Sequence, residues 1–336
     1  MTARVRWGVV GCGWVTREHA VPALRSLPGA SLAAVCDRDR GRAAALAGPA
    51  RVATDVDGLL APGDVDAVYV ATPHDDHAAT VTAVAAHGVA VLCEKPMATS
   101  HTDARAVVTA CRGRLAGTAF DQRFHPAHRR IAEIVAEGGL GTVTAVRIVY
   151  GCWLPPEWSP PGAAPGEVNW RADPVRAGGG ASADLAPHGV DLVGVLLDDD
   201  LVALEIMRQH RVHPYPVDDG SVLVGRTGRS VLFSGHVSFN TGDALPRRSL
   251  HVVGTAAQLV AEDTMGQTAG GTLTRIDART GARSGIDFDT ATDPFTAQLA
   301  AYTAAVAGTA PWPFPLDRDL RLHRLLDDAM TRSADR

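Results

Sequence analysis

The chain has 336 residues, which is more than one hydrophobic core usually supports, so two domains are expected. Hydrophobic residues make up 46% of the chain and charged residues 21%, a balance that is typical of globular proteins and excludes extensive disorder. The net charge of −5 is spread along the chain without a basic stripe, so nucleic acid is not an expected partner. Neither a signal peptide nor an apolar run of about 18 residues occurs, which predicts a cytoplasmic protein without a membrane partner.

The five cysteines form no C-x-x-C pair and are odd in number. This pattern favours reduced, mostly buried thiols over a disulfide framework or a thiolate zinc site. The cysteines are Cys12, Cys36, Cys93, Cys111 and Cys152.

Short β-branched runs alternate with helical patterns over the first 120 residues, as expected of a parallel sheet with crossover helices. The expected strands are Val5–Val10, Leu32–Cys36, Ala67–Val70, Ala90–Cys93 and Leu115–Ala119. The expected helices are Thr16–Leu27, Arg38–Ala47, Asp76–His87 and Thr102–Arg112. Thr99 or Ser100 is placed to cap the last helix, and Pro22 should kink or shorten the first.

The pattern changes after Phe120, so the domain boundary is expected there, between residues 1–120 and 121–336. The second domain is expected to be a mostly antiparallel open sheet with helices on one face. Its expected helices are Pro126–Glu137, Asp184–Leu197, Pro294–Val306 and Asp317–Arg332, and its expected strands are Val143–Tyr150, Leu201–Met207, Ser221–Val224, Ser230–Phe239, Ser249–Val253 and Gln258–Glu262. A long loop, 151–180, carries six prolines and three tryptophans, which is typical of a functional or disordered segment.

A glycine-containing turn joins the first strand to the first helix, where main-chain amides can face an anion. Gly11 permits the tight turn, and Gly13 lets a pyrophosphate approach the backbone. Thr16 stands where the third glycine of the dinucleotide fingerprint is expected, so an ordinary strand-to-helix turn remains an equal alternative. The segment Gly11, Cys12, Gly13, Trp14 and Val15 is the expected phosphate loop.

The second strand ends at Asp37, whose carboxylate can accept hydrogen bonds from ribose hydroxyls and repel a 2′-phosphate. This favours NAD over NADP. The neighbouring Arg38 weakens the preference, because a guanidinium can pair with a phosphate. The alternative for Asp37 is an N-cap for the following helix.

Three further segments resemble the Gfo/Idh/MocA oxidoreductases. They are Ala71-Thr72-Pro73-His74 with His77, then Glu94-Lys95-Pro96, and finally Gly178-Gly179-Gly180 followed by Asp184, His188 and Asp191. Two positions depart from the family pattern. His74 stands where Asn is common, which puts one cofactor contact in doubt, and Ala186 replaces a glycine.

The resemblance implies a doubly wound Rossmann domain followed by an open-sheet domain, with NAD or NADP between them and a sugar or polyol as substrate. It also implies cofactor contacts from Thr72, Pro73, His74, His77, Glu94, Lys95, Trp170 and Arg171. Substrate contacts are expected from Lys95, Arg123, Trp153 and His188. The tryptophans of the long loop could stack on a sugar ring or pack against another subunit or domain.

Oxidising a secondary alcohol requires a base within hydrogen-bond reach of the hydroxyl. Lys95, the only lysine in the chain, is expected to hold the oxygen, and His188 is expected to accept the proton. Asp184 lies one helical turn before His188 and is expected to orient it, bringing the imidazole pKa toward working pH. Without the resemblance, a surface lysine and a structural histidine would be the simpler interpretations.

Histidines elsewhere in the chain give only weak indications of function. A metal site at His74 and His77 lacks a third ligand at metal spacing and is not expected. The pairs His125/His128 and His210/His213 are interpreted as surface pairs.

Two other functions remain open at this point: a cofactor-binding sensor without catalysis, and an NADP-dependent ketoreductase acting on a nucleotide-linked sugar. An exposed open sheet needs covering, so a homodimer or homotetramer through the second domain is expected.

Overall fold

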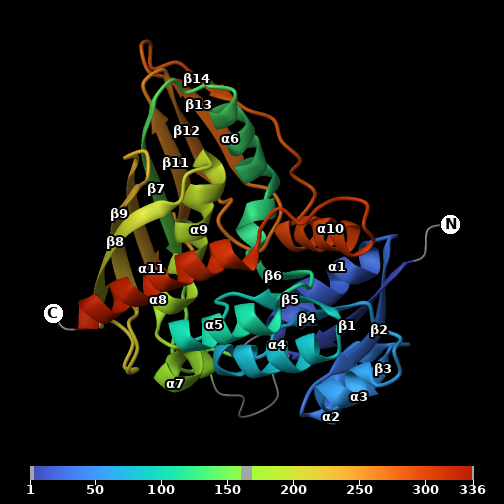
Figure 1. Ribbon diagram of the computed structural model, residues 1–336. Coiled ribbons are helices and arrows are strands. Elements are labelled where there is room, and N and C mark those ends of the chain that lie inside the picture. Colours follow the sequence, from blue (N-terminus) through green and yellow to red (C-terminus); the bar gives the residue numbers. More distant parts are fainter. Residues whose placement is uncertain (1–3, 160–168, 335–336) are drawn as a thin grey trace. The chain divides into compact units, whose positions relative to one another are not determined.

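A computed structural model describes residues 4–159 and 169–334, which form two compact units (Figure 1). Among the described residues, the first unit comprises 4–119, 159 and 295–321, and the second comprises 120–158, 169–294 and 322–334. Within the described residues, no helix is long and apolar enough to cross a membrane.

The described part of the first unit contains a six-stranded parallel sheet of order β3-β2-β1-β4-β5-β6. Its strands are β1 (Val5–Val10), β2 (Ala30–Cys36), β3 (Arg51–Ala53), β4 (Ala67–Val70), β5 (Ala90–Glu94) and β6 (Ala116–Ala119). The order reverses beside β1, as in a doubly wound Rossmann sheet, which confirms the expected fold class. The sequence analysis missed β3, because three residues are too short to show a period.

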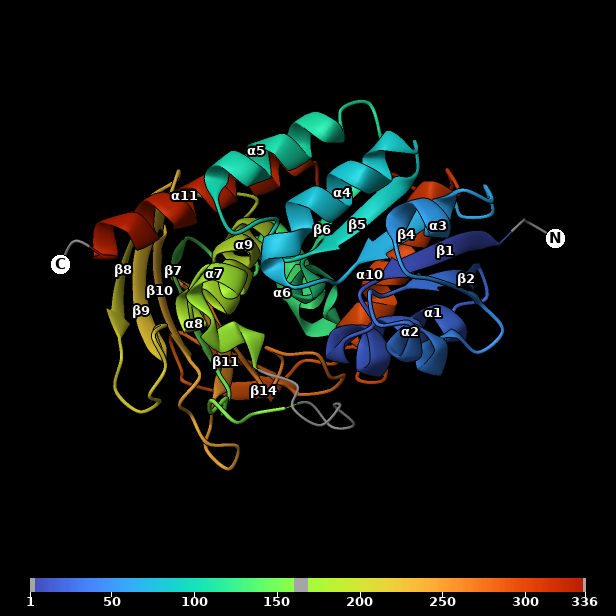
Figure 2. The same cartoon turned by 90° about the horizontal axis from the view of Figure 1, so that it is seen from below.

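Helices cover both faces of this sheet (Figure 2). They are η1 (Thr16–Ala20), α1 (Val21–Ser26), α2 (Arg40–Ala47), α3 (Val56–Leu60), η2 (His74–Asp76), α4 (His77–Ala86), α5 (His101–Ala110) and α10 (Pro294–Val306). The core under α1, α2 and α10 is distinct from the core under α3, α4 and α5. Ser100 caps α5, as expected.

The first helix begins with a π-helical turn, in which the Val21 amide donates to the Thr16 carbonyl. Pro22 explains this irregularity, because proline has no amide hydrogen and its ring crowds the carbonyl four residues earlier. The expected disturbance at Pro22 is therefore present as a local widening of the helix.

Helix α10 belongs to the first unit from Phe295 onward, although the sequence analysis assigned all of residues 121–336 to the second domain. The Tyr302 hydroxyl donates to the carbonyls of Val91 and Leu115, and Trp7 Nε1 donates to Thr303 Oγ1. These contacts bind α10 to residues that lie 187 to 296 positions earlier in the chain, and the sequence gives no indication of partners so far away.

The described part of the second unit contains an eight-stranded sheet of order β14-β13-β12-β11-β7-β10-β9-β8. Its strands are β7 (Val143–Gly151), β8 (Leu201–Gln209), β9 (Gly220–Thr227), β10 (Leu232–Ser238), β11 (Arg248–Gly254), β12 (Ala257–Glu262), β13 (Thr272–Asp277) and β14 (Arg283–Gly285). All neighbours are antiparallel except β7 and β10. The mostly antiparallel sheet is confirmed, while β13 and β14 were not predicted.

The remaining helices are η3 (Asp121–Phe124), α6 (Pro126–Ala136), η4 (Trp170–Ala172), α7 (Pro174–Ala177), α8 (Ala181–Asp184), α9 (Ala186–Leu197) and α11 (Leu316–Ala334). Helix α9 packs on the sheet through Gly189, where an added Cβ would lie 3.6–3.7 Å from Ile148 and Phe233. The expected helix over residues 184–197 divides at Leu185, and Pro187 lies in the first turn of α9 as expected.

Candidate active site

The turn after β1 depends on glycine at one position and leaves space at another. Gly11 has φ +92°, and an added Cβ would lie 2.5 Å from the Ala71 carbonyl oxygen. At Gly13 an added Cβ would meet nothing within 4 Å. Thr16, at the position of the missing third glycine, donates from Oγ1 to the Gly11 carbonyl at 2.6 Å and so closes the turn. The turn therefore has the shape and the open approach that a pyrophosphate requires.

Two aromatic contacts support the outer side of this turn. The Trp14 ring meets His19 edge-on at 5.2 Å, and His19 stacks on Phe295 at 4.8 Å. Trp14 and Val15 lie in the first helical turn, directly before η1, where main-chain amides have no intrahelical partner.

The Asp37 carboxylate is held beside the turn. It accepts from the Cys12 amide at 2.8 Å and from the Asp39 amide at 2.9 Å. Asp39, not Asp37, caps α2, so the N-cap alternative for Asp37 is wrong. Arg38 Nη2 lies 3.0 Å from Asp76 Oδ2, and the Arg38 side chain is 79% exposed. The glycine turn with a carboxylate at the end of β2 fits the adenosine end of a dinucleotide.

His77 joins the turns that follow β4 and β5. Its ring nitrogens lie 2.9 Å from the Thr72 carbonyl oxygen and 2.8 Å from that of Pro96. Burial lowers the pKa of His77, although both carbonyls favour the protonated ring. Both nitrogens face main-chain groups, so His77 supports this turn, and its predicted cofactor contact stays a prediction.

His74 and Pro73 lie in the same turn. His74 is buried, with its ring 5.6 Å from that of His77. Whether Pro73, His74 and Thr72 contact the cofactor stays a prediction.

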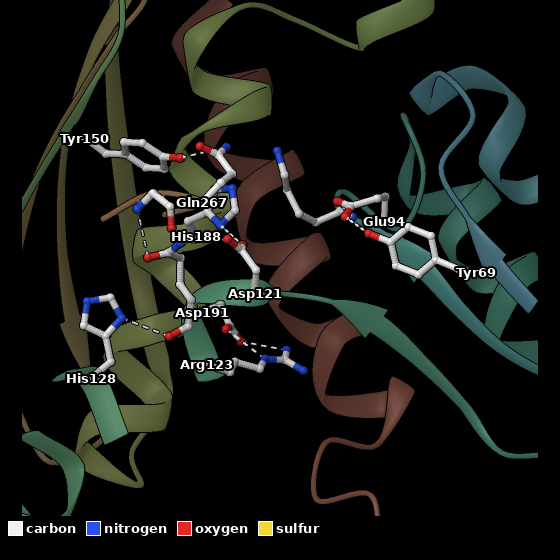
Figure 3. A network of polar contacts seen from close by, with 12 residues as sticks. Tyr69, Glu94, Asp121, Arg123, His128, Tyr150, His188, Asp191 and Gln267 are labelled. Atoms are coloured by element: carbon white, nitrogen blue, oxygen red, sulfur yellow. Dashed lines mark hydrogen bonds and ion pairs between the residues drawn. The ribbon is translucent and has the colours of Figure 1, made fainter. Parts of the chain in front are cut away.

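Glu94 is anchored from below by a residue that the sequence analysis missed. The Tyr69 hydroxyl donates a short hydrogen bond to Glu94 Oε1, and the Lys95 amide donates to Glu94 Oε2 at 3.2 Å (Figure 3). Tyr69 is fully buried in β4, the neighbour of β5. This pair fixes the end of β5, so the predicted strand-end position of Lys95 is rigidly supported.

In the second unit, His188 lies buried near the start of α9. Its Nδ1 is 3.3 Å from Oδ1 of Asp121, the first residue of η3, and its ring centroid is 5.4 Å from that of Tyr150 (Figure 3). Asp121 was not predicted as a site residue, because it lies 67 positions before His188 and the two residues meet only in the folded chain.

Arg123 and Asp191 form a fully buried ion pair one turn farther along α9. Arg123 Nε lies 2.9 Å from Asp191 Oδ2 and Nη2 lies 2.7 Å from Oδ1, with side-chain exposures of 0% and 1%. The guanidinium also lies over the Phe120 ring at 4.5 Å. This bidentate pairing holds η3 against α9, and the predicted contact of Arg123 with substrate stays a prediction.

Asp184, the last residue of α8, pairs with a cation from the preceding loop. Arg171 Nε lies 3.3 Å from Asp184 Oδ2, and the Arg171 guanidinium lies 4.4 Å from the Trp170 ring centroid. The predicted cofactor contacts of Trp170 and Arg171, and the orienting role of Asp184, stay predictions.

The glycine run before α8 is held by Asp218, another residue that the sequence analysis missed. Its carboxylate accepts from the amides of Gly180 and Ser182 and from the hydroxyls of Ser182 and Ser221. A Cβ on Gly180 would overlap the Asp218 carbonyl oxygen. Glycine is therefore required where the chain enters the segment that carries Asp184 and His188.

The described part of the long loop contains Trp153, which is 43% exposed. Its ring meets His213 edge-on at 4.8 Å, and His213 lies 5.2 Å from Tyr215. The loop's Pro160, Pro161 and Pro165 lie outside the described residues.

The burial of the histidine pairs differs from the prediction, whereas the burial of the cysteines agrees with it. His125, His128 and His213 are buried, so the interpretation of their pairs as surface pairs was wrong. The cysteines are free thiols, of which four are buried, as expected. Over residues 4–159 and 169–334, no group of three or more His, Cys, Asp or Glu is placed to hold a metal ion.

Comparisons with known proteins find relatives of both parts of the chain. Residues 5–116 match the family described as "Oxidoreductase family, NAD-binding Rossmann fold", and residues 128–260 match the "GFO/IDH/MocA C-terminal domain". A 1,5-anhydro-D-fructose reductase of Ensifer adhaerens is 32% identical over 309 residues, covering 90% of this chain and 88% of that protein. Inositol 2-dehydrogenase 3 of Saccharopolyspora erythraea is 34% identical over 216 residues, covering 63% and 58% of the two chains.

The fold is shared with an aldose-aldose oxidoreductase of Caulobacter crescentus, with a TM-score of 0.86 at 19% identity over 99% of this chain and 98% of that one. The chain belongs to the Gfo/Idh/MocA family of NAD(P)-dependent oxidoreductases, and its first unit is the NAD-binding Rossmann domain.

Proposed function

We propose that the chain transfers a hydride between NAD(P) and a secondary alcohol or ketone of a sugar, cyclitol or related polyol. The relatives named for an anhydro sugar and for inositol support this substrate class. The observation that carries the proposal is a buried imidazole, His188, with a carboxylate 3.3 Å away. Such a pair suits a group that takes up and returns a proton.

Lys95 and His188 divide the work on the reacting oxygen. The Lys95 ammonium holds the oxygen and stabilises alkoxide charge as it develops. His188 accepts the hydroxyl proton during oxidation and returns it during reduction. The bound nicotinamide accepts or supplies the hydride. Lys95 belongs to the first unit and His188 to the second, so the proposal requires both to act on one substrate carbon.

The cofactor is held by the turn after β1 and by Asp37. The amides of Gly13 and its neighbours would hold the pyrophosphate, and the Asp37 carboxylate would accept hydrogen bonds from the ribose hydroxyls. NAD is the preferred cofactor, because Asp37 repels a 2′-phosphate and Arg38 is already paired with Asp76.

Trp153 offers an apolar face to the substrate. Its exposure and its contact with His213 are typical of an aromatic side chain that stacks on a sugar ring.

The substrate test uses purified protein with NAD and NADP. A panel of sugars and cyclitols is offered with the oxidised cofactors, and keto sugars, including a nucleotide-linked one, with the reduced cofactors. We expect the absorbance of reduced nicotinamide to change with at least one member of the panel and to stay constant with His188→Ala. Nucleotide binding without turnover of any substrate would contradict the proposed reaction and favour a sensor.

A homodimer or homotetramer forms through the outer face of the second unit's sheet. Five apolar side chains on β8, β9 and β10 are 50–77% exposed: Val202, Met207, Val222, Val224 and Leu232. Such a patch needs a cover. Val222→Lys should reduce the mass measured by light scattering, whereas Val175→Lys, at a 76% exposed position on α7, should not. A monomeric native protein would contradict this assembly.

The free thiols suit a cytoplasmic location.

A further inference from the structure

Asp121 and its neighbour Gln122 form a chain of polar contacts that ends at His188. Gln122 Nε2 donates to Asp121 Oδ2 at 2.8 Å and to the Gly266 carbonyl at 2.7 Å. The Gly266 amide donates back to Gln122 Oε1 at 3.3 Å. Asp121 then presents its other oxygen, Oδ1, to His188 Nδ1. Asp121, Gln122 and His188 are all buried, so the chain is shielded from water.

We propose that Asp121 is the positioning residue of His188 and that Gln122 orients the Asp121 carboxylate. This rests on the proposed function, in which His188 handles the substrate proton. It replaces the simpler expectation that Asp184 alone orients the imidazole.

The chemistry follows from which oxygen meets which nitrogen. A carboxylate beside Nδ1 favours the tautomer that carries its proton on Nδ1, which makes Nε2 the basic nitrogen. During oxidation the hydroxyl proton moves to Nε2, and the imidazolium charge is then balanced by Asp121. During reduction the same proton returns from Nε2 to the alkoxide. At 3.3 Å the contact has an ion-pair distance without hydrogen-bond geometry in this structure, and catalytic contacts commonly tighten only when substrate binds.

Gln122 keeps the carboxylate from rotating. Its amide is fixed at both ends by Gly266, so its Nε2 holds Asp121 Oδ2 in one place. The Arg123–Asp191 pair adds a second link between the same two segments, because Asp191 lies three residues after His188 on α9. The imidazole and its carboxylate are thus held from both sides.

Other charged and titratable groups near His188 compete less well for this role. Asp184, four residues earlier, is paired with Arg171, which offsets its charge. Asp191 is neutralised by Arg123. Tyr150, on β7, presents its ring, and burial together with the charge of Asp121 raises the pKa of its hydroxyl, which stays neutral.

The first test needs no substrate. Protein labelled with ¹⁵N-histidine is titrated by NMR, and the His188 signal is assigned by its loss in His188→Ala. In Asp121→Asn, which keeps the side chain's shape, the His188 midpoint should fall by about one pH unit or more. In the matched control Asp184→Asn, the His188 midpoint should move by only a few tenths of a pH unit. Asp121→Glu should restore most of the shift, which separates a charge effect from misfolding.

The second test follows turnover. Asp121→Asn should lower kcat about 10- to 100-fold with little change in KM, and should move the acidic limb of the pH–rate profile to lower pH. Gln122→Leu should also lower kcat and move the acidic limb of the pH–rate profile to lower pH, each by a smaller amount than Asp121→Asn.

The outcomes of the two tests separate the proposals. A midpoint that moves in Asp184→Asn and not in Asp121→Asn would overturn the assignment of Asp121. A midpoint that moves in Asp121→Asn while kcat is unchanged would overturn the role of His188 in turnover and leave the charge pairing supported.

Discussion

The two units hold their functional side chains in different ways. In the first unit, the Asp37 carboxylate at the end of β2 is held by main-chain amides, those of Cys12 and Asp39. In the second unit, the charged side chains of η3 and α9 are buried and contact one another across long stretches of chain, as Arg123 contacts Asp191. Loops that bind a cofactor can adjust, whereas a group that handles a proton benefits from a fixed, dry environment. The cost of that environment is the desolvation of charges.

The strongest test of this comparison asks whether the two units act on one reacting carbon. Lys95→Met and His188→Ala should each lower kcat by about 10²- to 10⁴-fold, because each removes a group from the transition state. The double variant should lose much less than the product of the two effects. The measurement is steady-state kinetics with the substrate identified by the panel. Fully multiplicative losses would show that the two groups act independently.

Removing one member of the buried ion pair should cost the second unit much of its stability. Arg123→Met leaves Asp191 buried without its partner, which should lower the free energy of unfolding by roughly 3–5 kcal/mol. The double variant Arg123→Met/Asp191→Leu should recover most of that loss. Urea unfolding measures both. A single variant as stable as the native protein would contradict the importance of the pair.

Alanine substitutions at two glycines of the first unit should distinguish a loss of stability from a loss of cofactor affinity. Gly11→Ala places a Cβ against the Ala71 carbonyl at a positive φ, so it should destabilise the protein by about 1–3 kcal/mol. Gly13→Ala meets open space, so its unfolding should change by less than about 1 kcal/mol while its affinity for NAD(P) falls. Thermal unfolding and fluorescence titration distinguish the two effects. Equal loss of stability in both variants would argue against the open approach at Gly13.

Cofactor preference should respond to one carboxylate and not to its neighbour. Asp37→Ala should weaken NAD by about tenfold, equivalent to about 1.4 kcal/mol, and strengthen NADP, because the ribose contact and the repulsion of a 2′-phosphate are both lost. Asp39→Ala should lower stability by about 1 kcal/mol through the lost cap of α2 and leave the preference unchanged. Binding constants for both nucleotides test this. A preference that changes only in Asp39→Ala would contradict the role of Asp37.

Acidic pH should lower the free energy of unfolding because of buried histidines, whereas near neutral pH these histidines should have no effect on stability. Burial lowers the pKa of His128 to about 3 and that of His125 to about 4, against an ordinary value of 6.5. Between pH 6.5 and these lowered pKa values, the unfolded chain binds more protons than the folded one. The free energy of unfolding therefore falls as pH decreases below about 6.5. His128→Gln should flatten this dependence in urea titrations between about pH 6.5 and 4. An unchanged slope would mean that other groups dominate.

The sequence predicted the elements whose information is local. The parallel strands, the glycine turn and the position of Pro187 follow from runs of a few residues, and the structure has them. The strand β3 was missed because three residues carry no period. In the second unit the sequence indicated His188 but not Asp121, since their contact depends on how η3 meets α9. Arg123 was expected at the substrate because an arginine's pairing with a residue 68 positions away leaves no local trace.

The return of α10 to the first unit means that most of the second unit is inserted within the first, while the chain from Leu322 onward belongs to the second unit again. Phe295, Leu299 and Tyr302 are almost completely shielded from solvent and close the core around Trp7. On the ribosome, the nucleotide-binding sheet therefore emerges early but stays open on one side until almost the entire polypeptide has been synthesised. A fragment ending near residue 120 would leave this apolar surface bare and should aggregate, so shortening the gene to express the Rossmann sheet alone requires residues 295–321 to be rejoined to it.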